Sequence, residues 1–257
     1  MSCTSPSPWH LENHLARLRI DGLAASLDLL RPGAGLMNWD GLGERLSSFR
    51  ILAIEMPALR AGDPQVLAEA YSRGPDLIAA YRATADWPVF LHAMWKALAV
   101  EQSPGILAAL DLIVSARTEL LDARPELSVR AVLPAGGVLR LSNEESAAFQ
   151  PWGPVAGESR AALPSEGPAC VLFRPRSSHL SYAEMVHPAD FSGSELIEDD
   201  TAGRHLAIHH RLFVHRLEKG VLLRARVRGL LLAREDDAEL AAASYRGFAG
   251  LGPPLGA

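Results

Sequence analysis

The sequence predicts an all-β protein, a large antiparallel β-sandwich or supersandwich that ends in one short C-terminal helix. Three observations support this. Apolar residues recur mostly with a period of two, runs rich in Gly, Pro and Asp separate the apolar stretches, and a clear helical spacing occurs only near the end of the chain. A series of strands closed by one helix is typical of a sandwich with a packed terminal helix.

The first half of the chain reads as a succession of short strands. Residues 15–20 and 23–30 are predicted to form two strands separated by Asp21-Gly22, a dipeptide typical of tight hairpin turns. The last strand of this half, 106–118, also carries side chains at helical spacing, but the β-branched Ile113 and Val114 favour a strand. Between these segments we expect strands at 49–56, 66–72, 77–83 and 89–99.

The second half contains a segment that reads as one long surface loop, residues 142–168, with turn signals such as Trp152-Gly153-Pro154. Loops of this length are commonly functional lids or disordered insertions. Strands are then expected at 169–174 and 179–187, followed by an acidic connector at 194–200. The loop could also mark a domain boundary, but apolar strands continue on both sides of it, so we expect residues 15–257 to form a single domain. The Ser- and Pro-rich residues 1–14 are expected to be a flexible leader.

The end of the chain predicts a helix. Asp236 with Glu239 three residues later resembles a capping box. Three residues at helical spacing would then form the packed face, and Gly250 with Pro253-Pro254 would end the helix. The three residues are Leu240, Ser244 and Phe248.

Composition excludes several classes of protein. The net charge of −5 argues against general polyanion binding, so no nucleic-acid partner is expected. There is no run of 18 apolar residues, and the N-terminal residues lack the pattern of a secretory signal, so we expect no membrane partner and a cytoplasmic location. The cysteines, Cys3 and Cys170, have no zinc-site spacing, and no nucleotide or metal motif occurs, so no cofactor is expected.

The segment 204–232 is the most informative part of the sequence, and it reads as a β-hairpin. A two-residue loop, or a four-residue loop at 217–220 with Gly220 at a positive φ, would place Arg211 opposite Arg226 and His209 opposite Arg228. A three-residue loop at 218–220 would instead place the arginines beside the apolar Leu212 and Val214. In the preferred register, one face is apolar except for His210. The polar face would carry the candidate ligand-binding residues His209, Arg211, His215, Arg224, Arg226 and Arg228.

That polar face has three interpretations. It could be the solvated outside of the sheet, or an arginine-lined surface for an acidic sugar or another small anion. It could also be a metal site built from His205, His209 and His215. Side chains four residues apart in a strand are separated by about 13 Å, so two of these histidines cannot share one ion without a bend. We therefore predict no metal site.

A second group of chemistry-bearing residues lies at 181–188. Tyr182 and Glu184 should share one strand face, with His187 at the end of the strand. A phenol, a carboxylate and an imidazole so close in sequence are candidates for general acid–base catalysis. In a regular strand, however, His187 points away from Glu184. The alternative is a strand edge with Tyr182 half-buried.

Tryptophans offer a further hint of a ligand. Four of the five lie in or beside predicted loops, and a tryptophan exposed on a sandwich can stack on a sugar ring, although most tryptophans in a chain of this size pack in the core. The four are Trp39, Trp87, Trp95 and Trp152.

Two segments resemble known families. The opening, LRIDGLAASLDLLRPGAGLMNW at 18–39, resembles the first strands of galactose-mutarotase-like supersandwich domains. The segment HRLFVHRLEKGVLLRARVRGLLLAREDD resembles the ending of uncharacterised bacterial proteins of planctomycete type, and this resemblance brings no activity with it. The first resemblance implies a large sandwich and a sugar or sugar-acid ligand. Mutarotase-like enzymes use a His and a Glu as acid and base, but no motif here matches theirs, so no catalytic residue is carried over.

Two functions remain open from the sequence. One is a carbohydrate-active enzyme, epimerase- or lyase-like, in which the arginines bind an acidic sugar and His187, Glu184 or a hairpin histidine transfers protons. The other is a non-catalytic ligand-binding or assembly protein with a basic sheet face. The two differ in whether the arginines line a concave pocket or an open sheet. The sequence specifies neither the reaction nor an oligomeric state.

Overall fold

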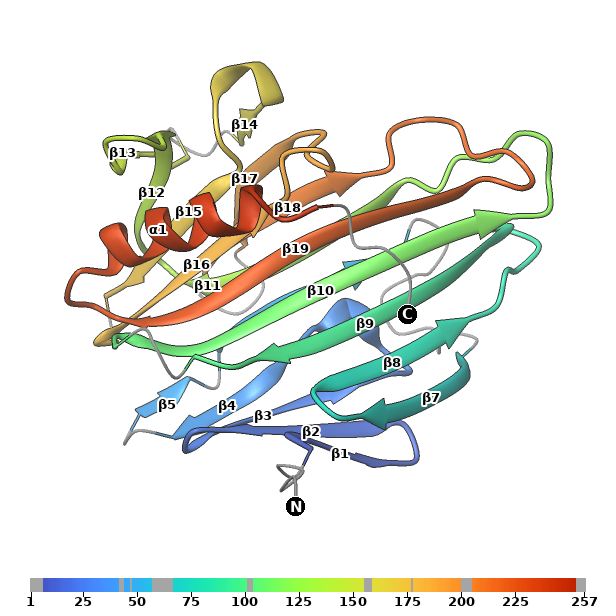
Figure 1. The fold of residues 1–257 in the computed structure, drawn as a ribbon, viewed down its shortest axis with the longest axis horizontal. Helices are drawn as coiled ribbons and strands as arrows, with labels where there is room; N and C mark the ends of the chain where they lie inside the picture. Colours follow the sequence, from blue (N-terminus) through green and yellow to red (C-terminus); the bar gives the residue numbers. More distant parts are fainter. Residues whose placement is uncertain are drawn as a thin grey trace.

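The computed structural model of the chain describes residues 7–41, 44–46, 48–56, 67–100, 104–154, 159–176, 178–199 and 205–252. Within these residues, the strands form three antiparallel sheets, and one α-helix follows the last strand (Figure 1). The all-β prediction with a terminal helix is confirmed. No helix in the described part of the chain is long and apolar enough to cross a membrane.

The three sheets are named here by position and size. The N-terminal sheet has the order β1 (Trp9–Glu12), β2 (Leu15–Ile20), β3 (Leu23–Asp28), β4 (Met37–Gly41) and β5 (Glu44–Leu46). The large sheet has the order β13 (Ala148–Pro151), β12 (Gly136–Asn143), β15 (Cys170–Pro175), β16 (Leu180–Val186), β19 (Leu222–Ala233), β10 (Ile106–Thr118), β9 (Val89–Leu98), β8 (Asp76–Tyr81) and β7 (Leu67–Arg73). The small sheet has the order β14 (Arg160–Ala162), β17 (Ser194–Asp199), β18 (His205–Leu212), β11 (Leu127–Pro134) and β6 (Arg50–Glu55).

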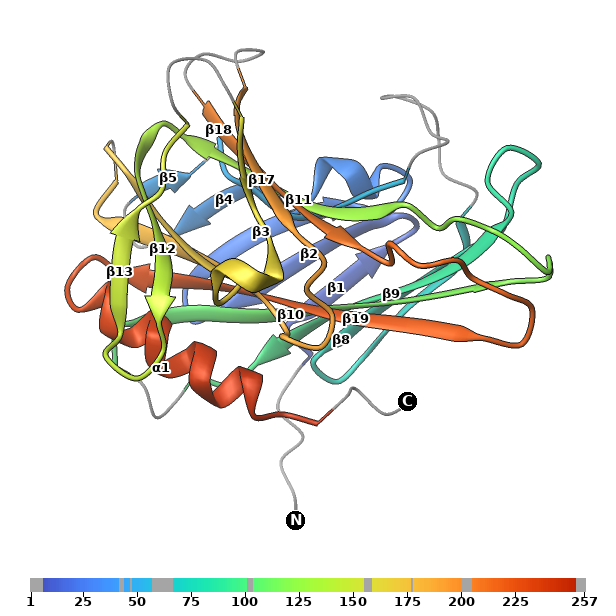
Figure 2. The ribbon, with the colours of Figure 1, turned by 90° about the horizontal axis from the view of Figure 1, so that it is seen from above.

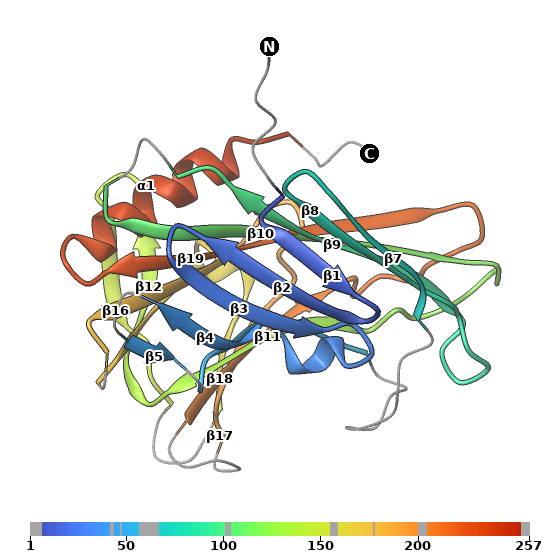
Figure 3. The ribbon, with the colours of Figure 1, turned by 90° about the horizontal axis from the view of Figure 1, so that it is seen from below.

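The large sheet is covered on both faces. One face packs against the N-terminal and small sheets around a continuous apolar core. Polar tips of core aromatics join the layers: the Trp95 indole donates to the Leu52 carbonyl, and the Tyr81 hydroxyl donates to the Leu29 carbonyl. The N-terminal sheet lies across the large sheet, with β1 beside β7 (Figure 3).

The other face of the large sheet carries the helix α1 (Asp237–Ala249), on the side away from the small sheet (Figure 2). A second apolar cluster, which includes Tyr245 and Phe248, fills this layer. Asp237 is buried and anchors the start of α1, because its carboxylate accepts hydrogen bonds from Arg174 and Ser181. Helix docking therefore depends on a buried ionic contact as well as on apolar packing.

The predicted N-terminal hairpin is confirmed. β2 and β3 are joined at Asp21 and Gly22, which both have positive φ, as a turn of this type requires. The run at 106–118 is the long central strand β10, so the β-branched residues predicted it correctly. The apolar runs at 49–56 and 89–99 contain β6 and β9, and those at 66–72 and 77–83 overlap β7 and β8, each of which extends one residue beyond its run.

Other segments differ from the sequence prediction. Within the expected leader, Trp9–Glu12 forms β1, because the Trp9 ring is buried and its indole donates to the Pro75 carbonyl. The expected loop 142–168 contains β13 and β14, and the expected acidic connector contains β17. Cys170 is buried in the layer under α1, whereas Cys3 lies outside the described residues.

The terminal helix begins differently from the prediction. The Asp236 side chain makes no capping hydrogen bond, so the predicted capping box is wrong. The packed face of the helix includes Phe248 and the partly buried Leu240, as predicted, but its other fully buried apolar residues are Ala241, Ala242 and Tyr245, and Ser244 is not among them. Pro253 and Pro254, expected to end the helix, lie outside the described residues.

Candidate ligand-binding site

Tyr182 and Glu184 lie on the same face of β16, as the alternation predicts, and both point into the core between the large and small sheets. The Tyr182 hydroxyl donates a hydrogen bond to the Glu184 carboxylate. The Tyr182 ring lies over Gly229 on the neighbouring strand β19, where a Cβ atom would meet the phenolic oxygen at 2.7 Å. Glycine at this position therefore makes room for the ring.

His210 extends this pair into the small sheet. It is the one polar residue on the core-facing side of β18, and its Nε2 lies 3.2 Å from Oε1 of Glu184, within ion-pair distance although the angle is poor for a hydrogen bond. On its other side, Nδ1 lies 2.6 Å from the hydroxyl oxygen of Ser194 on β17. The buried relay Tyr182–Glu184–His210–Ser194 thus connects β16 to β18 and β17.

The buried relay is closed to solvent in this structure. Tyr182, Glu184 and His210 are 0% exposed and Ser194 is 2% exposed. Burial raises the pKa of the Tyr182 phenol well above its ordinary value, and the neighbouring Glu184 raises it further. These groups can share a proton among themselves, but no substrate can touch them without opening the core.

His187 is not part of the buried relay. It lies on the opposite face, as expected for a regular strand, and its ring packs edge-on against Phe248 of α1. Both ring nitrogens have partners: Nδ1 accepts from the Ala189 amide, and Nε2 donates to the Leu251 carbonyl. The structure therefore brings together Tyr182 and Glu184 of the three candidate catalytic residues, and leaves His187 as a contact to the C-terminal segment.

The predicted hairpin at 204–232 is wrong. β18 pairs with β11 and β17 in the small sheet, whereas β19 pairs with β10 and β16 in the large sheet. The connection at 213–221 crosses from one sheet to the other, with Phe213 in a left-handed conformation and Leu217 bridged to Ala123. Arg211 and Arg226 are therefore not cross-strand partners, and the six candidate ligand-binding residues do not share a face.

Three of those six residues lie on or beyond the outer face of the small sheet. His209 points outward, and its Nδ1 is 2.9 Å from the Glu55 carboxylate. Arg211 and His215 are exposed. Burial raises the pKa of the Glu55 carboxyl, but the hydrogen bond and charge of His209, with Arg130 and Ser128, outweigh it and lower this pKa overall. The basic residues here are partly neutralised by acids from neighbouring strands.

The other three, Arg224, Arg226 and Arg228, lie on the α1 side of the large sheet. Arg228 forms a two-pronged ion pair with Asp111 on β10, and Arg224 donates to the hydroxyl oxygen of Ser115. The arginines are therefore divided between two outer faces of the molecule. Within the described residues, no group of three His, Cys, Asp or Glu side chains is placed to hold a metal ion.

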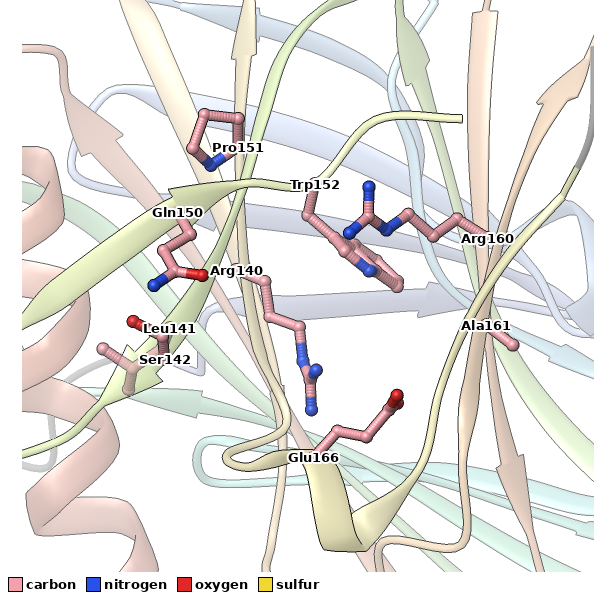
Figure 4. A pocket seen from close by; sticks show the side chains of 9 residues that line it. All are labelled: Arg140, Leu141, Ser142, Gln150, Pro151, Trp152, Arg160, Ala161 and Glu166. Atoms are coloured by element: carbon pink, nitrogen blue, oxygen red, sulfur yellow. The ribbon is translucent and has the colours of Figure 1, made fainter. Parts of the chain in front are cut away.

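A cleft of about 150 Å³ lies where the edges of the large and small sheets meet, between β12, β13 and β14. Arg140 comes from β12, Gln150 from β13 and Arg160 from β14, and the buried Trp152 ring stands between them (Figure 4). Glu166 closes the side facing Arg140 (Figure 4). The cleft therefore combines two guanidinium groups, an amide, a carboxylate and an aromatic ring.

The charges in the cleft are unequal. The Glu166 carboxylate already has a partner within the protein, because it accepts a hydrogen bond from the Leu163 amide at 2.7 Å. Arg140 donates to the Gly167 carbonyl, and its partial burial lowers its pKa, an effect that nearby Glu166 opposes. Arg160 is exposed. Two permanent cations beside one carboxylate leave a net positive charge, which favours a small anion.

Sequence reasoning found this region only in part. The segment 142–168 is predicted as a long loop, typical of a functional lid or a disordered insertion, and Trp152 as an aromatic beside a loop. All four tryptophans of that set are buried, so Trp152, at 4% exposed, lines the cleft from below without being a free stacking platform. Arg140 and Arg160 were missed, because they lie on strands of different sheets and no sequence pattern joins them.

Comparison with known proteins supports the fold. No family model and no curated protein sequence matches the chain. Among solved structures, the chain is similar to a candidate aldose 1-epimerase from Escherichia coli K12, with a TM-score of 0.57 and 8% identity over 84% of this chain and 97% of that one. It is similar to a candidate mutarotase from Salmonella typhimurium, with a TM-score of 0.55 and 13% identity over 89% and 97%.

A candidate aldose 1-epimerase from Klebsiella pneumoniae is similar as well, with a TM-score of 0.58 and 10% identity over 95% of this chain and 87% of that one. The chain therefore has a mutarotase-like β-sandwich fold, as its opening residues suggested. At this level of identity the likeness concerns the fold, and function has to be derived from the site.

Proposed function

We propose that this protein binds a small acidic sugar in the cleft between β12, β13 and β14. The observation that carries the proposal is the convergence of Arg140 and Arg160, from two different sheets, on one cleft with an aromatic side. Guanidinium groups recognise carboxylates through planar, charge-assisted hydrogen bonds. The positive balance of the cleft favours a sugar acid over a neutral sugar.

The remaining residues of the cleft suit the rest of a sugar. The exposed Gln150 amide can both donate to and accept from hydroxyl groups, and Glu166 keeps acceptor capacity beyond its bond to the Leu163 amide. The Trp152 ring is buried and forms part of the apolar lining of the cleft. A lining rich in hydrogen-bonding groups suits the many hydroxyl groups of a sugar acid.

We assign binding, without turnover, as the primary function. An epimerase- or lyase-like reaction needs an acid and a base in contact with the substrate. The sequence candidates do not meet this condition, because Tyr182 and Glu184 are fully buried and both ring nitrogens of His187 are engaged. The fold of the similar structures, which are described as aldose 1-epimerase and mutarotase, supports a sugar as the ligand class.

Calorimetric titration tests the proposal. We expect galacturonate or glucuronate to bind the wild-type chain, and galactose to bind at least about tenfold more weakly, because it lacks the charged group worth about 1.5–3 kcal/mol. R160Q should weaken uronate binding by about tenfold or more. R211Q is the matched control: it also removes one exposed arginine, but from the outer face of the small sheet.

Two outcomes would overturn the proposal. One is a folded wild-type chain that binds no uronate. The other is loss of binding in R211Q with retention in R160Q, which would move the ligand to the small sheet. A separate incubation of the uronate with the protein should return the sugar unchanged, and its conversion would replace the binding assignment with an enzymatic one.

A further inference from the structure

The three arginines of β19 differ in the hydrogen-bond and ion-pair partners that neighbouring strands offer them. The register of the large sheet places Arg228 opposite Asp111 and Arg224 opposite Ser115, and both pairs are joined by hydrogen bonds. Arg226 lies between these two arginines and faces the apolar Ile113. The residue opposite Arg226 on β10 therefore offers no side-chain acceptor.

Arg226 is nevertheless almost fully buried. The residue is 8% exposed, and its Nε is inaccessible and has no hydrogen-bond partner among the described residues. No carboxylate in the described part of the chain lies within ion-pair distance of its guanidinium. Asp190 accepts the backbone amide of Arg226 through its Oδ2 at 2.9 Å, and its charge also interacts with the Arg226 side chain without reaching ion-pair distance. A guanidinium whose Nε is buried without a partner and which forms no ion pair is unfavourable, because buried polar groups are normally hydrogen-bonded and buried charges paired.

Two arginines and two acids lie around Arg226. The charged groups that face it are Arg224 and Arg228 along its own strand, Asp111 on β10 and Asp190 from the segment after β16. His187 hydrogen-bonds through its backbone amide to the Arg226 carbonyl, and its ring nitrogens are engaged elsewhere. Asp111 pairs with Arg228, and Asp190 accepts the backbone amide of Arg226, so neither carboxylate forms an ion pair with the Arg226 guanidinium.

We propose that Arg226 is the centre of a second binding site, specific for a small tetrahedral oxyanion such as phosphate, on the α1 side of the large sheet. Arg224 lies two residues away on the same face, a spacing of about 6.8 Å along the strand that lets two guanidinium groups approach one anion. The oxyanion supplies the acceptor that Arg226 lacks. This site is separate from the cleft, which lies at the sheet edges beside β14.

Thermal unfolding of the full chain tests this site. Phosphate should raise the Tm of the wild type above its value in chloride at the same ionic strength, and acetate should raise it less. R160Q, which alters the cleft, should keep the phosphate shift, whereas R226M should lose it. In chloride, R226M should melt at or above the wild-type Tm, because an apolar side chain of similar length replaces an unpaired buried charge.

The opposite results would overturn the site. A Tm of R226M far below wild type in chloride would mean that Arg226 is already paired, through Asp190. No phosphate shift in the wild type would exclude the anion. R226K is a second variant in case R226M does not fold, because lysine keeps the charge but lacks the planar guanidinium group. Calorimetry should show phosphate binding about tenfold weaker in R226K than in the wild type. An unchanged Kd would contradict the proposal. Because R160Q and R226M act on different sites, either proposal can fail alone.

Discussion

Replacement of His210 by leucine tests the buried relay most sharply. The imidazole lies between the Glu184 carboxylate, 3.2 Å from Nε2, and the Ser194 hydroxyl, 2.6 Å from Nδ1, and all three residues are buried. Leucine would leave the carboxylate without this partner in the core. Removing one partner of a buried pair costs about 3–5 kcal/mol. For a chain of this size, that corresponds to a fall in Tm of roughly 6–20 °C.

The same change should cost much less when the carboxylate is absent. In an E184L background, H210L removes mainly the contact to the Ser194 hydroxyl, a loss of about 1–2 kcal/mol. Urea unfolding of the four chains, followed by tryptophan fluorescence, gives the coupling energy between the two residues. An equal cost of H210L in both backgrounds would refute the relay as an energetic unit.

Three further predictions follow from single contacts. G229A should destabilise the chain by about 1–3 kcal/mol, because the new methyl group meets the buried Tyr182 ring, and urea unfolding measures it; a neutral result would mean that the ring can move. D237A should weaken the docking of α1, because it removes the buried carboxylate that accepts from Arg174 and Ser181. Amide hydrogen exchange should therefore accelerate in α1 and not in β10, and unchanged protection of α1 would contradict the anchoring role of Asp237. Glu55 has a lowered pKa in the folded chain, mainly because of His209. Its contribution to the free energy of unfolding is therefore present above a pH of about 4.5 and is lost as the pH falls through the folded-state pKa. E55Q should flatten the plot of unfolding free energy against pH in that acid range, and an unchanged slope would show that Glu55 is not responsible.

Sequence periodicity predicted which way side chains face better than which strands are neighbours. Leu206, Ile208, His210 and Leu212 do share the core face of β18, as the alternation requires. The partner of β18 was wrong, because alternation contains no information on pairing and two consecutive strands normally form a hairpin. The connection at 213–221 instead carries the chain between layers, and this depends on long-range packing.

The candidate site was less predictable for the same reason. Tyr182 and Glu184 are two residues apart on one strand, so their contact could be read locally, but His210 joins them from another sheet. Arg140 and Arg160 come together only because the edges of two sheets meet. The predicted loop 142–168 covers part of the cleft, but β13 and β14 inside it are short and carry little apolar periodicity.

The location of a bound sugar acid would test the central proposal most directly. A crystal structure of the wild-type chain grown with galacturonate should show the sugar in the cleft, with its carboxylate within hydrogen-bond distance of the Arg140 or Arg160 guanidinium and its ring beside Trp152. Galacturonate bound only at Arg226 or on the outer face of the small sheet would contradict the proposal, as would an empty cleft at saturating sugar.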